Sequence, residues 1–452
     1  MSTLLARNAR VLVTMDDERR EIAHGGLFIR DGFIEQIDDS GNLPKQADEI
    51  VDLTGHIVLP GFVNTHHHLN QSLDRAYPPS QNGNLVQWLK GLYPRWEQCA
   101  PEDTELATEL GLAEIALSGA TTVADHQYLW PKGVTAARQF EAASKIGVRF
   151  HLGRGSQNIG QAHGGFAPVS MIEDEDNVLA GTSEVIAQFH DPSPGSFRQV
   201  FVAPSSLRTA TPALMQKSAE LAAKHGLRFH FHLGETKAEI DFVAGKYGKR
   251  PAQFAEELGC LTPRSWVAHG VHFDEGDIAL LGRCGCGICH CPSSNMRLNS
   301  GIAPVSRYLK NGLTVGLGVD GSASNDSSNL LVELRTALLL SRVAAEENAD
   351  FLSARTVLEM ATRNSARLLG RTDIGVLAPG YAADFIAFDT DRIEIAGSED
   401  PVAAIAFCAM TRVDNSWVHG RPLVQRGQLA GYDVADLVER IRLRSRDRRG
   451  AS

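Results

Sequence analysis

The chain has 452 residues, of which 43% are hydrophobic, and a formal net charge of −10 at pH 7. This length allows one large domain and a smaller one. The acidic balance and the sequence pI of about 5.9 exclude the basic stripe that a nucleic-acid-binding protein would need.

The N-terminus lacks a long apolar segment followed by a cleavage site, and no stretch of the sequence approaches the ~18 apolar residues of a membrane span. Seven cysteines, an odd number in a chain of this size, do not suggest a disulfide framework. We therefore expect a cytoplasmic protein with neither a membrane nor a nucleic acid as partner.

Short alternating strands are predicted at both ends of the chain, with Asp31-Gly32 as a hairpin turn near the start. The segments are residues 4–13, 26–37, 383–388, 415–419 and 423–429. Because the middle of the chain lacks this pattern, we predict one small β-sandwich domain formed by residues 1–58 together with 375–432. The remaining residues, 433–452, are predicted to form a C-terminal helix or tail whose basic run is solvated.

Residues 59–374 alternate apolar strand-like runs with helical stretches such as 104–117 and 212–224. The predicted strands are Ile57–Val63, Thr121–Asp125, Arg149–Leu152, Val200–Ala203, Arg228–His232, Trp266–Ala268, Gly287–His290 and Thr314–Val319. Eight such units indicate an α/β fold of the (β/α)8 TIM-like barrel type. The alternative, an open doubly wound sheet, would need a glycine-rich turn where His66-His67-His68 stands.

Two segments invite more specific interpretations. The cysteine-rich run 284–291 could be a structural zinc site or a haem attachment site, but it is predicted to be a buried strand ended by Pro292, with Cys289 and Cys291 as small apolar side chains. The loop 157–177 is unusually long, which is typical of a lid, a substrate wall or a disordered segment.

Polar residues gather at the carboxyl ends of the predicted strands, which in a barrel converge on one face. Residues two apart on a strand point the same way, so His66 and His68 can share a metal while His67 points away. Later strands end in His232 and Glu235, in His269, and in Asp320. Imidazoles and a carboxylate suit one divalent ion, with Zn²⁺ expected and Fe²⁺ as the alternative.

Five motifs in order resemble those of the amidohydrolase superfamily, in the branch that holds chlorohydrolases, guanine deaminase and adenosine-type deaminases. The motifs are PGFVNTHHHL, HFHLGET, AHGVHF, CHCPSSNMRL and GLGVDGSASND, and IGVLAPGYAADFIAFD is similar to the return of that family into its sandwich domain. The resemblance covers nearly the whole chain.

The resemblance implies that His66, His68, His232 and Asp320 bind one metal ion. It also implies that Glu235 shuttles protons and that His269 hydrogen-bonds the attacking oxygen. Some relatives carry a carboxylated lysine on strand four that bridges two metals. The segment 199–204 contains no lysine, so a single ion is expected.

The residues support hydrolysis independently of the resemblance. A divalent ion lowers the pKa of a bound water toward about 7. Asp320 can bind the ion and accept the proton of that water, and Glu235 can protonate a ring nitrogen and then help the amine leave as ammonia. These roles predict a deaminase of a flat nitrogen heterocycle.

Further segments resemble the 8-oxoguanine deaminases of the same branch. The resemblance implies that Gln71 hydrogen-bonds a ring carbonyl or amide, that Trp88 and Tyr128 pack on the ring, and that Arg154 holds an oxo group. The expected reaction converts 8-oxoguanine to urate and ammonia. Structural roles for Trp88 in the core and for Arg154 in an ion pair are the alternatives.

One loop departs from that group. Residues 203–211 read APSSLRTAT, where a loop containing cysteine and phenylalanine is expected. Isoxanthopterin or another pterin, guanine and amino-triazines therefore remain alternative substrates, and dechlorination or cyclic-amide opening remains an alternative reaction. We also expect a homo-oligomer, a dimer or larger.

Overall fold

The computed structural model describes residues 2–131, 133–344 and 351–450. Its largest sheet contains eight strands, and every pairing between neighbours is parallel. The strands are β8 (Phe62–Asn64), β10 (Ala120–Gln127), β11 (Arg149–Ser156), β12 (Arg198–Pro204), β13 (Phe229–Leu233), β14 (Ser265–His269), β15 (Gly287–His290) and β16 (Val315–Leu317). A hydrogen bond of 3.0 Å from Thr65 N to Leu317 O joins the first and last strands, which confirms the predicted barrel.

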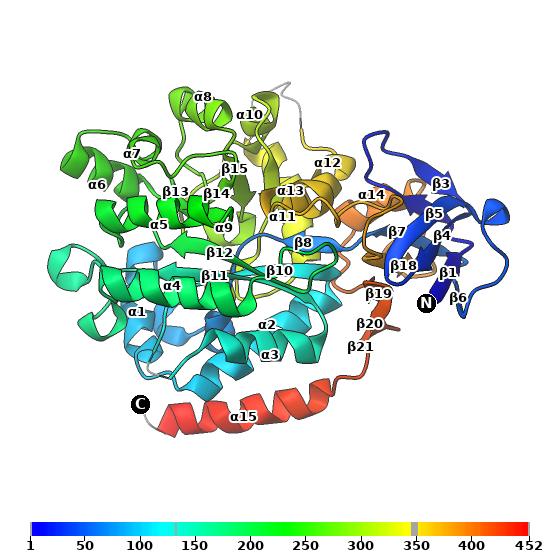
Figure 1. The fold of residues 1–452 in the computed structure, drawn as a ribbon, viewed down its shortest axis with the longest axis horizontal. Coiled ribbons are helices and arrows are strands. Elements are labelled where there is room, and N and C mark those ends of the chain that lie inside the picture. Colours follow the sequence, from blue (N-terminus) through cyan, green and yellow to red (C-terminus); the bar gives the residue numbers. More distant parts are fainter. Residues whose placement is uncertain (1, 132, 345–350, 451–452) are drawn as a thin grey trace.

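Helices surround this sheet, as Figure 1 shows. They are α1 (Leu85–Trp96), α2 (Pro101–Leu117), α3 (Ala136–Ile146), α4 (Glu175–Phe189), α5 (Pro212–Lys224), α6 (Lys237–Tyr247), α7 (Pro251–Glu257), α8 (Glu275–Cys284), α9 (Pro292–Arg297), α10 (Val305–Lys310), α11 (Leu330–Ala344), α12 (Ala354–Glu359), α13 (Ser365–Leu368) and α14 (Pro401–Phe407). Helix α5 shows why these segments begin where they do. The Thr211 side chain accepts a hydrogen bond from Leu214 N, and Pro212 occupies the first turn.

The prediction that residues 57–63 form a single barrel strand is wrong. The segment forms two strands that belong to different sheets: β7 (His56–Pro60) pairs with β18 (Phe385–Asp389), and only β8 enters the barrel. The chain changes sheets at Gly61, where a Cβ atom would lie 2.2 Å from Thr121 Oγ1. Proline followed by glycine thus ends one ladder and allows a close approach to the next.

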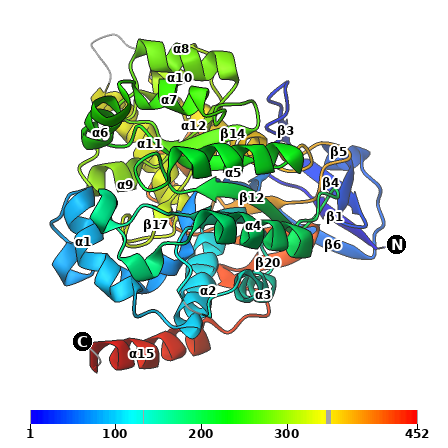
Figure 2. The same cartoon turned by 60° about the vertical axis from the view of Figure 1, so that its left-hand side comes forward.

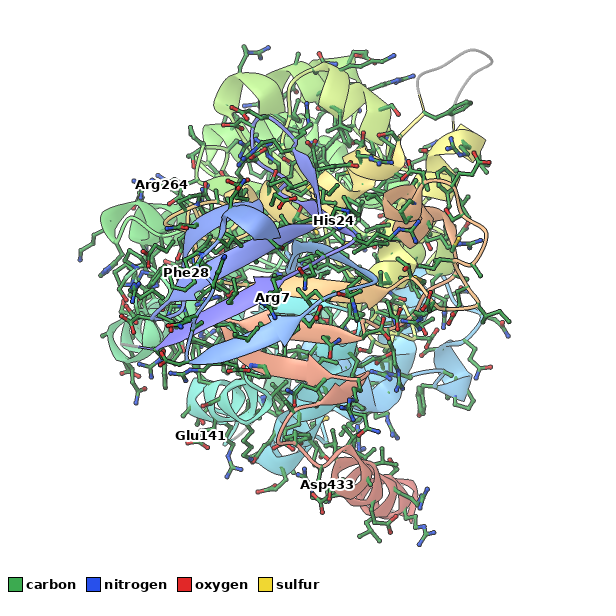
Figure 3. The ribbon with its side chains drawn as sticks, turned by 90° about the vertical axis from the view of Figure 1, so that its right-hand side faces the viewer. Arg7, His24, Phe28, Glu141, Arg264 and Asp433 are labelled. Atoms are coloured by element: carbon green, nitrogen blue, oxygen red, sulfur yellow. The ribbon has the colours of Figure 1, made fainter. Side chains whose placement is uncertain are left out.

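Strands from both ends of the chain form the smaller module, which faces the viewer in Figure 3. Its two sheets have the strand orders β5-β4-β1-β6 and β21-β20-β19-β18-β7-β2-β3. The strands not yet given are β1 (Thr3–Arg7), β2 (Val11–Val13), β3 (Glu21–Ala23), β4 (Gly25–Arg30), β5 (Phe33–Asp39), β6 (Glu49–Asp52), β19 (Asn415–Val418), β20 (Arg421–Gln425) and β21 (Gln428–Leu429). A separate buried cluster that includes Phe385 stacked on Trp417 fills the module, as expected for the predicted sandwich.

The hairpin between β4 and β5 turns at Asp31-Gly32, as predicted. Both residues have positive φ angles, 50° and 84°, which a two-residue turn of type I′ requires. The cysteine-rich run also behaves as predicted, because Cys289 and Cys291 are fully buried around the end of β15.

The last helix, α15 (Val434–Gly450), runs along α2 at the edge of the barrel in Figure 2. Three arginines spaced four residues apart face acidic side chains of the barrel domain. Arg440 pairs with Glu109, Arg444 with Asp103 and Arg448 with Asp74, at 2.7, 2.6 and 3.1 Å. Several residues of the basic run therefore bind the barrel rather than solvent. None of the described helices is both long enough and apolar enough to cross a membrane.

Candidate active site

The predicted metal ligands meet at the carboxyl end of the barrel. His68 lies in the short strand β9 (His67–His68), which pairs with β17 (Asp320–Gly321). Asp320 Oδ1 lies 3.3 Å from both His66 Nε2 and His68 Nε2. His232 Nε2, at the end of β13, lies 3.1 Å from His68 Nε2. His67 points away, as predicted, with its Nε2 3.0 Å from Ser328 Oγ.

Hydrogen bonds behind the cluster fix which ring nitrogen faces it. His68 Nδ1 donates to the carbonyl of His126 at 2.8 Å, and His232 Nδ1 donates to the carbonyl of Ser205 at 2.7 Å. A carbonyl oxygen only accepts, so each Nδ1 carries the proton and each Nε2 presents a lone pair to the cluster.

A relay of two imidazoles orients His66 in the same way. His230 Nδ1 donates to the carbonyl of Trp266 at 2.9 Å, which leaves His230 Nε2 as an acceptor. His66 Nδ1 lies 2.8 Å from that acceptor and therefore carries a proton. His66 Nε2 is buried and has no hydrogen-bond partner among the described residues. A buried lone pair without a partner is costly, and here it faces the other ligand atoms.

The proton states of these side chains suit a cation. Burial lowers the pKa of His66 well below its usual range and that of His68 to about 4, so both rings are neutral at pH 7. His66, His68 and Asp320 each place one ligand atom within 4.8 Å of the others, and His232 Nε2 lies 3.1 Å from His68 Nε2. Three imidazole nitrogens and one carboxylate are a ligand set that fits one divalent metal ion.

The backbone conformation is strained at two of the site residues. His269 and Asp320 have φ angles of 76° and 60°, a left-handed conformation that costs a non-glycine residue on the order of 1–3 kcal/mol. The other oxygen of Asp320 accepts hydrogen bonds from Ser294 Oγ and, at 3.0 Å, from Ser324 Oγ. These contacts hold the carboxylate in one orientation.

Glu235 and His269 stand together beside the cluster. Glu235 Oε2 lies 3.9 Å from His269 Nε2, and Glu235 Oε1 accepts a hydrogen bond of 3.2 Å from Ser300 Oγ. Burial raises the pKa of Glu235 to about 7, so at neutral pH this carboxyl can both accept and donate a proton. His269 Nδ1 donates to Asn295 Oδ1 at 2.9 Å, which turns Nε2 toward the site.

A cavity that is open at its mouth leads to these groups. Gln71, Trp88 and Tyr128 line it together with His68, His232, Glu235, His269 and Asp320. Trp88 Nε1 donates to the carbonyl of Ala323 at 2.9 Å, and this bond fixes the indole ring in the wall. The buried Gln71 Oε1 packs against Gly321 and has no hydrogen-bond partner among the described residues.

Arg154 does not line the cavity, where its predicted contact with a substrate oxo group would require it to be. Its guanidinium lies outside the barrel against Gly181 of α4, where it forms two hydrogen bonds of 2.6 and 2.8 Å to Glu173. It also stacks over the Trp130 ring at 4.8 Å. Arg154 is therefore a buried structural ion pair, the alternative considered above.

Two loops that the sequence marks as unusual supply residues that the sequence did not identify. Phe166, from the long loop 157–177, lines the cavity, so this loop forms part of its wall. Arg208, from the divergent loop after β12, lines it as well. Loop position and length pointed to both segments, but neither feature indicates which side chain turns inward.

Comparison with known proteins gives a consistent result. The family model described as "Amidohydrolase family" matches residues 57–423. The chain is 45% identical over 423 residues to an 8-oxoguanine deaminase of Pseudomonas aeruginosa, covering 93% of this chain and 94% of that protein. It is 34% identical to an isoxanthopterin deaminase from an unknown prokaryotic organism, covering 96% and 95%.

Solved structures resemble the whole chain. An atrazine chlorohydrolase from Arthrobacter aurescens TC1, complexed with zinc, superposes with a TM-score of 0.94 at 32% identity, covering 98% of this chain and 100% of that one. The similarity therefore includes both the barrel and the smaller module.

Proposed function

Because this chain belongs to the amidohydrolase family, we propose that it is a metal-dependent aminohydrolase that converts 8-oxoguanine and water to urate and ammonia. The observation that carries the proposal is the position of Glu235, a buried carboxyl with a pKa of about 7, in the same cavity as the predicted metal ligands His68, His232 and Asp320. The 45% identity to an 8-oxoguanine deaminase supports the choice of substrate.

In this proposal His66, His68, His232 and Asp320 hold one zinc ion, since their donor atoms and proton states fit it. Iron would accept the same ligands. The zinc in the similar chlorohydrolase structure supports the first choice. When bound, the ion supplies a Lewis acid that lowers the pKa of water.

The protein side chains then manage the protons. Asp320 accepts one proton from the attacking water, and His269 Nε2 accepts a hydrogen bond from the other O–H of that water. Glu235 delivers its proton to the ring nitrogen beside the amino carbon. It then takes up the remaining proton of the attacking oxygen and passes it to the amino group, which leaves as ammonia. The proton held by Asp320 returns to Glu235 at the end of the cycle. A carboxyl with a pKa near 7 can perform both transfers at neutral pH.

Gln71, Trp88 and Tyr128 are proposed to bind the heterocycle. The Gln71 side chain lines the cavity, and its amide can exchange hydrogen bonds with a ring N–H or carbonyl group. The Trp88 and Tyr128 rings give the cavity flat apolar walls that suit a planar purine. Isoxanthopterin has the same planar amino-oxo character, and the similarity to an isoxanthopterin deaminase favours it as the second candidate.

The test is an ammonia-release screen of the zinc-loaded protein over 8-oxoguanine, guanine, isoxanthopterin and amino-triazines, with chloride release from chlorotriazines measured in parallel. We expect the highest kcat/KM with 8-oxoguanine. Glu235→Gln is the matched control, because it should retain metal while losing roughly 10²- to 10⁴-fold in kcat. Release of chloride without ammonia, or full activity of the Glu235→Gln protein, would refute the proposal.

A further inference from the structure

Arg208 occupies an unusual position at the wall of the cavity. It lies in the loop between β12 and α5, and its guanidinium stacks over the ring of Phe166 at 4.2 Å and over the ring of Phe242 at 5.2 Å. Phe166 comes from the long loop after β11, and Phe242 comes from α6. Aromatic rings from two other segments therefore stack on the Arg208 guanidinium and fix its orientation.

This cation has no acidic partner within 4 Å among the described residues, in contrast to Arg154. Its Nε is buried and makes no hydrogen bond with any of them. The nearby Glu239 already accepts hydrogen bonds from the N–H groups of Gly234 and Glu235, at 3.2 and 2.9 Å. Burial raises the pKa of Glu239 to about 7, so it does not fully neutralise the arginine at neutral pH.

A partly desolvated guanidinium without a partner is unfavourable unless a ligand supplies hydrogen-bond acceptors for its N–H groups. The two aromatic rings cover faces of the guanidinium, which leaves its N–H edge to form hydrogen bonds. An edge of this kind matches an electron-rich oxygen in the plane of a flat heterocycle. The ligand class is therefore an oxo-substituted ring that lies in the same cavity as Glu235.

We propose that Arg208 is a specificity-determining residue that binds the oxo group at the end of the substrate remote from the reacting amino carbon. This inference rests on the proposed function, which places the amino carbon beside Glu235 and His269. In 8-oxoguanine the 2-amino group and the 8-oxo group lie at opposite ends of the purine, and guanine lacks the second group. Arg208 thus takes the role that the sequence assigned to Arg154.

The test compares kcat/KM for 8-oxoguanine and for guanine in the zinc-loaded wild-type, Arg208→Met and Arg208→Lys proteins. Loss of a charge-assisted hydrogen bond should lower the ratio of the two values by roughly 10- to 100-fold in Arg208→Met. The change should appear mainly in KM for 8-oxoguanine, and Arg208→Lys should recover part of it. Arg198→Met, at the exposed start of β12, the strand that precedes the Arg208 loop, is the control and should keep the wild-type ratio.

A binding measurement separates this inference from the proposed function. Urate carries the 8-oxo group and xanthine does not, so Arg208→Met should weaken binding of urate 10- to 100-fold more than binding of xanthine. If the wild-type protein releases no ammonia from either purine, the function fails, but the urate and xanthine affinities still test Arg208. An equal loss for both ligands, or an unchanged preference, would overturn the inference.

Discussion

Asp125 holds the backbone that directly follows the predicted metal-binding histidines. Its Oδ1 accepts a hydrogen bond of 2.8 Å from Leu69 N, and its Oδ2 accepts one of 2.8 Å from Gln139 Nε2. Burial raises the pKa of this carboxyl to about 7. The protein thus uses a side chain that titrates near neutrality to fix the loop after His68.

Replacing Asp125 by asparagine should change how stability depends on pH. The pKa of Asp125 is about 7 in the folded state and about 3.9 in an unfolded chain. Its contribution to stability is therefore complete below pH ~4 and is lost as the pH rises to about 7. Asparagine does not titrate, and its amide can donate to Gln139 Oε1, which has no partner among the described residues.

The stability of Asp125→Asn relative to wild type should therefore rise by about 2–3 kcal/mol between pH 5 and pH 8. Urea unfolding at the two pH values measures this difference. Asp241→Asn, which alters an exposed carboxylate of α6, is the control and should show a constant difference. A constant difference for Asp125→Asn as well would mean that its pKa is ordinary.

Sequence reasoning brought the predicted metal ligands together because each lies at or just after the carboxyl end of a predicted strand, and the resemblance to the amidohydrolase superfamily selected the ligands among them. His66 and His68 are two residues apart, and His232, His269 and Asp320 each follow a recognisable strand. The prediction that Arg154 contacts the substrate failed because the alternation of residues along a strand defines two faces without indicating which one faces the inside of the barrel. The neighbouring Gly153 and Gly155 occupy crowded positions where a Cβ would clash with adjacent strands, a constraint visible only in the assembled barrel.

At the scale of elements, α15 is fixed to the barrel by charge. Its mean hydropathy is low and its three paired arginines form one stripe, whereas the acidic partners Asp74, Asp103 and Glu109 are buried. The sequence composition correctly indicated a helix. It did not indicate that the helix binds the barrel, because the acidic partners lie more than 300 residues earlier in the chain. The division of residues 57–63 between two sheets was missed for the same reason, since it depends on distant partners.

The Arg444→Ala variant should lose about 1–3 kcal/mol of unfolding free energy. Asp103 would lose the two hydrogen bonds, of 2.6 and 2.9 Å, that Arg444 donates, and would keep the one from Ala100 N. The loss of hydrogen bonds to a buried carboxylate carries this cost. Arg442→Ala on the same helix removes only an exposed pair with Glu439 and should change stability by less than about 0.5 kcal/mol. Denaturant unfolding of both variants tests the prediction, and equal losses would contradict it.

At the scale of the whole molecule, a buried ion pair joins the barrel to the smaller module. Arg149 begins β11 at the end of the barrel opposite the candidate active site, and Asp384 immediately precedes β18 of the sandwich. Two hydrogen bonds of 2.6 and 2.9 Å connect their side chains, which are 0% and 1% exposed. Asp384 also accepts a hydrogen bond from His419 N at 2.8 Å, so it links three segments that are distant in sequence.

Removing one partner of this pair should cost far more than removing both. Asp384→Leu leaves the Arg149 guanidinium buried without its counter-ion, which typically costs about 3–5 kcal/mol. Arg149→Met leaves the Asp384 carboxylate in the same position. The double variant Arg149→Met/Asp384→Leu should lose less than either single variant, because apolar side chains then face each other. Denaturant unfolding of the three proteins measures this coupling, and additive losses would show that the pair does not act as a unit. Metal content should stay at the wild-type level in the folded fraction of each variant, since the pair lies at the opposite end of the barrel from His66, His68, His232 and Asp320.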